Sequence, residues 1–466
     1  MRRSWFLPVL WLPAAAAVYE GGPGKPYSSI GAVPWESLQP GDTVLIFWKS
    51  TPYYEKWAIG RTGTEAAPIT VRGVPGSGGA LPVIDGNNAT TRTSLRYWNE
   101  VRSVVKVGGT SVPDSSSPPG WIVIENLAIR NARQDLPFTS AQGISMTYSR
   151  NAAAIHIEVG HHLTVRNCEI SGSSNGLFIS GGSDIRIESN YIHSNGNPGS
   201  ITEHNTYTEA VNLVYEYNRL GPPRPDAGGN NLKDRSAGLV VRYNWIEGGN
   251  RQLDLVDSTY PELYTHPAYT RTYVYGNTLI ETYNPSLPGN KQVTHYGGDS
   301  GNTERYRKGT LYFYHNTVIS TRPDGMTLFR ASTNDERVDA RNNIFYTTAS
   351  GSYLAIADTS GIFDFSRNWI KTGWRISLSP FSGVFNDDGA RIEGAAPGFA
   401  SEAAGDYHLA PGSPCIRAAT PLHPLAAGVH EVLMHYVKHQ KAVQRLSSGN
   451  LDLGADPLEP PVAVVF

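Results

Sequence analysis

Side chains that can move protons and bind an anion are concentrated in the middle of the chain. His204 and Tyr207 lie three residues apart, Lys233 and Arg235 follow in one short segment, and His295 comes later. Histidine and tyrosine can exchange protons with a substrate, and a lysine can act as a base where nearby positive charge lowers its pKa. A guanidinium binds a carboxylate through paired N–H groups. This combination predicts removal of a proton from a carbon next to a carboxylate.

The same residues are assigned catalytic roles, and polar neighbours are assigned to substrate binding. We expect Lys233 to be the base or the stabiliser of developing charge, and Arg235 or Arg251 to hold the carboxylate. The two histidines, His204 and His295, and Tyr207 are expected to serve as acid and base. The side chains expected to bind substrate are Arg251, Tyr296, Asn230 and Arg242.

Asp254 and Asp257 are the candidate ligands of a metal ion. Calcium prefers carboxylate oxygens, so calcium is the one candidate cofactor, although residues three apart in an extended strand face opposite sides. The same carboxylates also offer an alternative chemistry. A glycoside hydrolase needs two carboxylates across the scissile bond, and Asp254 with Asp257 or Asp299 could supply them.

A third possibility is an adhesin that binds carbohydrate without reacting with it. Aromatic side chains on an outer face can stack on sugar rings, and the candidates are Trp245, Tyr260, Tyr264 and Tyr269. Insertions are concentrated between residues 218 and 309. They suggest the walls of a groove, which favours a defined site over a uniform adhesive face.

A repeat must position these residues. The phrase apolar, x, apolar, x, x, Asn, x, apolar recurs along the chain, with Cys168 at the Asn position of an early copy; the later copies are centred on Asn190, Asn218, Asn244, Asn277, Asn316, Asn343 and Asn368. The shortest interval fits one coil of a parallel β-helix, and the longer intervals carry insertions. Asn residues at the same turn of successive coils can pass hydrogen bonds from rung to rung.

The repeat predicts an all-β protein, a single-stranded right-handed parallel β-helix that ends in a short helical segment. Residues 18–426 are expected to form this solenoid. Residues 427–466 are expected to form a helix and a closing segment, because Val429, Val432 and Leu433 lie near helical spacing.

Alignment of neighbouring coils on their Asn residues predicts which side chains are neighbours. Tyr207 falls in register with Lys233, and Asp254 follows Lys233 by 21 residues, so the next coil could bring it close. Two opposite-charge pairs are also predicted on neighbouring strands: Glu209 with Arg235, and Glu216 with Arg242. Part of the charge is therefore structural, and the remainder is available for a site.

Composition limits the partners. The formal net charge is −2, which gives no electrostatic case for nucleic acid or an anionic membrane surface. Residues 1–17 have two arginines, an apolar run and an alanine-rich exit, the layout of a signal peptide, so we expect a secreted or periplasmic monomer. No other segment approaches about 18 apolar residues. Two cysteines are too few for a disulfide framework.

Phrases near both ends carry a resemblance to known families. The segments 34-PWESLQPGDTVLIFW-48, 67-APITVRG-73 and 82-PVIDG-86 resemble the first coils of the pectin-lyase-like β-helix superfamily, in particular polysaccharide lyase family 6, with its chondroitinase B and alginate lyases. The phrases 405-GDYHLAPGSPCIRAA-419 and 451-LDLGA-455 are similar to the closing segment of secreted β-helix proteins.

The resemblance implies β-elimination on an acidic, uronate-containing polysaccharide. In this family a lysine acts as base and an arginine follows about one coil later, often beside a calcium ion. Lys233 matches the lysine. The arginine position holds Asp254, with Arg251 the nearest arginine, and the positions of the family's acidic metal ligands hold residues 228–231, which are Gly-Gly-Asn-Asn.

Overall fold

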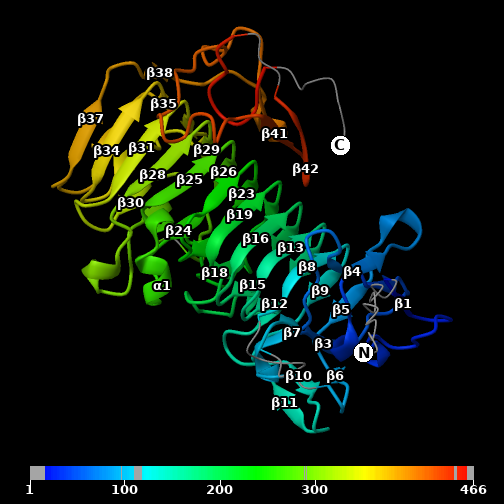
Figure 1. The fold of residues 1–466 in the computed structure, drawn as a ribbon. Coiled ribbons are helices and arrows are strands. Elements are labelled where there is room, and N and C mark those ends of the chain that lie inside the picture. The colour runs from blue at the N-terminus through cyan, green and yellow to red at the C-terminus, as the bar shows by residue number, and fades with distance from the viewer. Residues whose placement is uncertain are drawn as a thin grey trace, which may run out of the picture.

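The computed structural model describes residues 16–95, 97–109, 118–287, 289, 291–445 and 449–458. Its strands form a long solenoid in which each coil contributes one strand to each of three sheets (Figure 1). The predicted signal peptide, residues 1–17, lies almost wholly outside the described residues. None of the described helices has the length and apolarity that a membrane crossing requires.

Sheet 1 contains the strand that precedes the Asn turn of each coil. In spatial order its 13 described strands are β1 (Val18–Gly21), β2 (Thr43–Phe47), β4 (Ile69–Val74), β8 (Gly120–Glu125), β13 (His161–Arg166), β16 (Ser183–Glu188), β19 (Val211–Glu216), β22 (Val240–Arg242), β25 (Arg271–Tyr275), β28 (Thr310–Tyr314), β31 (Arg337–Arg341), β34 (Ile362–Ser366) and β37 (Val384–Asp387).

Sheet 2 carries the candidate site. Its 14 described strands are β11 (Ser145–Thr147), β10 (Pro137–Thr139), β6 (Ala89–Thr91), β3 (Glu55–Ile59), β7 (Ser103–Val107), β12 (Ala153–Ile157), β15 (Asn175–Ile179), β18 (Thr206–Thr208), β21 (Leu232–Asp234), β24 (Leu253–Leu255), β27 (Gln292–Tyr296), β30 (Met326–Ala331), β33 (Leu354–Ala357) and β36 (Arg375–Ser377).

Sheet 3 follows the Asn turn. Its 11 described strands are β38 (Ile392–Gly394), β35 (Trp369–Lys371), β32 (Ile344–Thr347), β29 (Thr317–Ser320), β26 (Thr278–Glu281), β23 (Trp245–Glu247), β20 (Arg219–Leu220), β17 (Tyr191–His193), β14 (Glu169–Ser171), β9 (Ala128–Arg130) and β5 (Val83–Asp85). Apart from the β10–β11 pair, the strands of all three sheets pair in parallel. The predicted β-helix is therefore confirmed.

The predicted Asn ladder is present. Asn244 accepts from the side-chain amide of Asn218 at 2.9 Å and donates to Asn277 at 3.0 Å, and the same contact repeats at the other rungs, Asn190, Asn316, Asn343 and Asn368. All of these side chains are fully buried. The stack satisfies amides that would be costly to bury singly, and it fixes the coil-to-coil register on which the site depends.

The predicted C-terminal helix is wrong. Residues 434–444 form an antiparallel hairpin of β41 (Met434–Val437) and β42 (Lys441–Gln444). The segment before it runs in turns over the outer tyrosines of sheet 1, where Tyr273 and Tyr314 donate to the carbonyls of Leu425 and His430. The bonds from these tyrosines hold the segment in turns against sheet 1, where no continuous helix forms among the described residues. Tertiary packing thus overrides the helical spacing of the valines.

Candidate functional site

One outward-facing residue from each of eight consecutive strands of sheet 2 forms a row that crosses these strands. Strand register places each member beside the next, in the order Lys106, His156, Phe178, Tyr207, Lys233, Asp254, His295 and Arg330. The predicted pairing of Tyr207 with Lys233 is confirmed. Successive members are about 4.8 Å apart, the spacing between neighbouring strands, so the coil repeat assembles a continuous strip of polar and aromatic groups.

Asp254 lies at the centre of the polar contacts in this row. Its Oδ2 accepts from Lys233 Nζ at 2.7 Å and from Asn230 Nδ2 at 2.7 Å. Its Oδ1 accepts from His295 Nδ1 at 2.9 Å and lies 3.4 Å from Arg251 Nη1. Burial alone would raise the pKa of Asp254, but Lys233, His295 and Arg251 together hold it well below its usual range. Asp254 is therefore an ionised anchor with 1 % of its surface exposed.

Lys233 and Arg235 share a second carboxylate. Asp299 Oδ2 lies 2.6 Å from Lys233 Nζ, and its Oδ1 lies 2.9 Å from Arg235 Nη2. Burial acts to raise the pKa of Asp299, but the two cations outweigh it and lower the value. Unlike Asp254, this side chain is one-third exposed. The pair of cations thus already binds a carboxylate at the surface.

Tyr207 adjoins this carboxylate-binding pair. Arg235 Nε donates to Tyr207 Oη at 2.8 Å, and the Tyr207 ring stacks on Phe178 with centroids 4.8 Å apart. The His204 ring lies 5.7 Å from the Tyr207 ring, and its Nδ1 accepts from the backbone N–H of Asn230. Burial, with the Lys233 charge, lowers the pKa of His204 to about 3. His204 is therefore neutral at physiological pH and unsuited to acting as an acid.

His295 lies in the row but has no ring nitrogen free for a substrate. Its Nδ1 contacts Asp254, its Nε2 lies 2.9 Å from Ser332 Oγ, and 2 % of the residue is exposed. The segment around it was expected to be an insertion, but residues 292–296 are strand β27. His295 thus positions Asp254, and its predicted part in acid–base catalysis stays a prediction. Ser332 gave no sequence signal.

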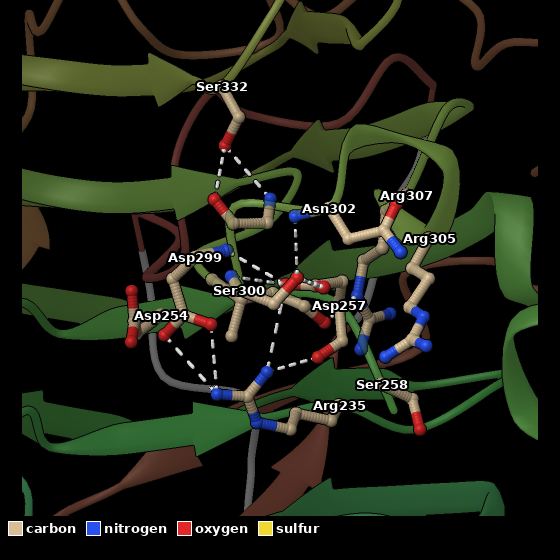
Figure 2. Close-up of polar contacts among 12 residues, drawn as sticks. Arg235, Asp254, Asp257, Ser258, Asp299, Ser300, Asn302, Arg305, Arg307 and Ser332 are labelled. Atoms are coloured by element: carbon tan, nitrogen blue, oxygen red, sulfur yellow. Dashed lines mark hydrogen bonds and ion pairs between the residues drawn. The ribbon is translucent and has the colours of Figure 1, made fainter. Parts of the chain in front are cut away.

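Asp257 anchors the loop that carries Asp299 (Figure 2). Its Oδ1 accepts from the backbone N–H groups of Asp299 at 2.8 Å and Ser300 at 3.2 Å, and its Oδ2 accepts from Ser300 Oγ. Arg235 Nη1 donates to the main-chain oxygen of Asp257. Asp257 is fully buried, so its role is to hold the loop over the two cations.

The predicted calcium site is not formed by Asp254 and Asp257. The oxygens of both carboxylates are occupied by protein donors, with a lysine, an arginine and a histidine on the first and loop N–H groups on the second. The described residues contain no group of three or more acidic, His or Cys side chains arranged to hold a metal ion. These residues therefore do not fit a bound cation, because neighbouring positive charge already neutralises them.

Of the predicted substrate-binding residues, two lie in the site and two do not. Arg251 and Asn230 contact Asp254, and Arg251 also donates to Gln292. Tyr296 points into the core with 1 % exposed, because its neighbour His295 takes the outward position and side chains alternate along a strand. Arg242 lies on sheet 1, where it pairs with Glu216 as predicted.

Two further expectations concerned pairing and sugar stacking. Glu209 does not pair with Arg235; it accepts instead from Ser258 Oγ, because Arg235 turns to Tyr207 and Asp299.

Among the aromatic residues proposed for an adhesive face, Trp245 and Tyr269 are buried, whereas Tyr260 is 42 % exposed. A uniform aromatic surface is therefore absent from these four positions.

Comparisons with known proteins agree with the fold. The family described as right handed beta helix region matches residues 84–264. The crystal structure of pectate lyase Pel9A superposes with a TM-score of 0.50 at 12 % identity, covering 95 % of this chain and 96 % of that one. The alginate lyase from Paenibacillus sp. str. FPU-7 gives 0.46 at 14 % identity over 69 % and 94 %.

A glycoside hydrolase is also similar in structure. The GH136 lacto-N-biosidase from Eubacterium ramulus gives a TM-score of 0.43 at 11 % identity, covering 82 % of this chain and 68 % of that one. A search of curated protein sequences finds no match. The protein has a right-handed, pectin-lyase-like β-helix fold.

Proposed function

We propose that the protein is a secreted or periplasmic polysaccharide lyase that cleaves a uronate-containing polysaccharide by β-elimination. One observation carries the proposal: Lys233 and Arg235 together hold a single, partly exposed carboxylate, that of Asp299, and Arg235 also contacts Tyr207 Oη. A uronate carboxylate can take the place of Asp299 on the same two cations, which brings the sugar ring beside the tyrosine.

The reaction follows from these positions. With its carboxylate on Lys233 and Arg235, the uronate loses its C5 proton to the phenolate form of Tyr207, which thereby becomes the neutral phenol, and the cations stabilise the enolate-like charge that develops. The bond from C4 to the leaving oxygen then breaks, a C4–C5 double bond forms, and the Tyr207 phenol gives the proton to the leaving oxygen, which regenerates the phenolate. Arg235 Nε, at 2.8 Å, would stabilise the charge on Tyr207 Oη while the proton is away.

Lys233 serves in this scheme as the charge stabiliser. Its ammonium group contacts both Asp254 and Asp299, so it lies where the substrate carboxylate and the developing negative charge would be held. Asp254 and His295 fix its position from the buried side of the row.

The same geometry disfavours hydrolysis by Asp254 and Asp299. A glycosidase needs one carboxyl group that keeps its proton near neutral pH. Cationic neighbours lower the pKa of both aspartates despite their burial. Neither can then supply the proton for the leaving group.

The test is to incubate the purified protein with alginate, chondroitin, pectate and glucuronan and to follow the ultraviolet absorbance of an unsaturated uronate. Absorbance should rise with at least one polymer. Lys233→Ala should lower the rate about a hundredfold or more, whereas Lys308→Ala, which alters an exposed ion pair with Asp335, should not. The thermal unfolding temperature of each variant shows whether the variant is folded.

Loss of Lys233 removes a positive charge that both Asp254 and Asp299 contact, which can destabilise the fold. Arg235→Gln is therefore a second variant for use if Lys233→Ala does not fold. New reducing ends without absorbance would mean hydrolysis. Full turnover in either variant would remove these cations from the mechanism.

A further inference from the structure

A cleft of about 470 Å³ lies beside the site row, two to three strands from Lys233. Its lining includes His156 on β12 and the residues that directly follow β12 and β15. One wall is the 3-10 helix η4 (Glu100–Arg102), and the other is the start of the insertion that carries α1 (Pro261–Tyr264). The residues that matter below are Arg102, His156, Glu158, Ser180 and Tyr260.

Aromatic contacts connect the cleft to the Lys233 site. The Phe178 ring stacks on Tyr207 with an interplanar angle of 6°, and the Arg102 guanidinium packs over the Phe178 ring at 4.7 Å. Phe178 and His156 are the next two members of the row after Tyr207. One polymer chain that crosses the strands would therefore pass from the site directly into the cleft.

Two nitrogen atoms in the cleft lack partners among the described residues. His156 is 2 % exposed, and its Nδ1 makes no hydrogen bond, although its Nε2 lies 2.9 Å from Ser180 Oγ. Arg102 Nε is also buried without an acceptor, and its guanidinium forms no ion pair with a described residue. Buried polar groups without partners cost free energy, so the Arg102 N–H calls for an acceptor oxygen, and the His156 nitrogen, a donor or an acceptor according to its tautomer, calls for a group such as a hydroxyl that can serve either role.

Arg102 is the cation in the cleft that can bind an anionic ligand. Lys106 forms an ion pair with Glu158 and so neutralises that carboxylate. Glu262 is exposed at the rim. A guanidinium that is half-buried and unpaired matches a carboxylate through two parallel hydrogen bonds. Tyr260, 42 % exposed at the opposite wall, presents an aromatic ring of the kind on which sugars stack.

We propose that this cleft is a second uronate subsite, in which Arg102 binds the carboxylate, His156 a hydroxyl group and Tyr260 the sugar ring. The inference rests on the proposed function and extends it. The substrate is then an acidic chain long enough to reach from Lys233 across Phe178, and the protein acts on polymers in preference to short fragments.

The experiment measures binding and cleavage of size-defined oligogalacturonates, oligoalginates and oligoglucuronates, from dimers to octamers. Calorimetry should show that the wild type binds long oligomers about tenfold more tightly than short ones, the gain expected from one added charge-assisted contact. Arg102→Gln should abolish that gain, and Arg102→Lys should restore part of it. Octamers with their carboxyl groups reduced to alcohols should bind the wild type and Arg102→Gln equally.

Tyr260→Ala is a second variant whose exposed position does not threaten folding, and it should also reduce the gain. Arg271→Gln alters an exposed arginine on sheet 1 and serves as the matched control. If Arg102→Gln and Tyr260→Ala both keep the length dependence, the subsite is overturned while the lyase activity stands. Length-dependent binding without cleavage would support the subsite and overturn the lyase. No binding of any oligouronate would overturn both.

Discussion

Asp299 contacts Lys233 through an ion pair of 2.6 Å, although 66 residues separate them in the chain. The aspartate reaches the lysine from a loop after β27 that Asp257 holds in place. Because Arg235 binds the other oxygen of the same carboxylate, Asp299 occupies the position in which a uronate carboxylate would bind. Under the proposed function, Asp299 would therefore compete with an acidic substrate for the two cations.

Asp299→Asn should strengthen substrate binding. The amide carries no charge, so the substrate carboxylate no longer has to displace an anion, and KM should fall about threefold to tenfold. The measurement is the initial rate against polymer concentration for the variant and for Asp335→Asn, whose aspartate forms an exposed ion pair with Lys308. A higher KM together with a much lower kcat would show instead that Asp299 takes part in the reaction.

Tyr207→Phe should remove most of the activity while preserving the fold. The phenyl ring keeps the stacking with Phe178, but the oxygen that contacts Arg235 is lost, and with it the proton carrier. Loss of a general acid–base group lowers kcat about a hundredfold to ten-thousandfold. Tyr54→Phe changes an exposed tyrosine near the N-terminal end of the solenoid and should behave as wild type. Undiminished kcat in Tyr207→Phe would assign the proton transfer to another group.

Glu209 should make the free energy of unfolding depend on pH. Burial raises the pKa of Glu209 to about 7; Ser258, Arg235 and Arg307 oppose the rise, and Asp234 adds to it. In the unfolded chain the group titrates near 4.3. The folded state therefore holds a proton that the unfolded state has released. The stabilisation is complete below the unfolded value and is lost as pH rises through about 7.

Glu209→Gln removes this titration. Relative to wild type, the variant should gain stability between pH 5 and pH 8, by about 2 kcal/mol. Urea unfolding at the two pH values measures the difference. Glu304→Gln, at an exposed glutamate, should show no such change. An equal difference at both pH values would mean that Glu209 titrates as an ordinary carboxyl group.

The sequence predicts the parts of the site that the coil repeat determines. Counting from the Asn residues places Tyr207 beside Lys233, because parallel strands one coil apart share a register fixed by the ladder. The same counting allowed Asp254 to approach Lys233, and it does. These contacts depend on period and alternation, which can be read from local sequence.

Other parts depend on insertions, which carry no period. The interval before Asn316 is long, and strand β27 within it could not be recognised from the sequence. The sequence therefore did not show that His295 faces outward and Tyr296 faces inward. The path of the loop that brings Asp299 to Lys233 depends on its own contacts with Asp257. The path of the segment before the C-terminal hairpin likewise depends on tyrosines of sheet 1 that are more than a hundred residues away.

The ladder itself gives the last prediction. Asn244 accepts from Asn218 through its side-chain oxygen and donates to Asn277 and to the Tyr215 carbonyl. Asn244→Ala leaves several of these buried groups without partners, and each such group costs about 1–3 kcal/mol.

The free energy of unfolding of Asn244→Ala should therefore fall by about 3 kcal/mol or more, as measured by urea denaturation. Asn151→Ala alters an exposed asparagine in a turn and should cost far less. The ladder also sets the coil register at β21 and β24. Asn244→Ala should therefore lose activity at urea concentrations near its unfolding midpoint, and it should keep activity at urea concentrations well below that midpoint. Equal stability of the two variants would show that the stacked amides contribute little, and that apolar packing alone sets the register of the site row.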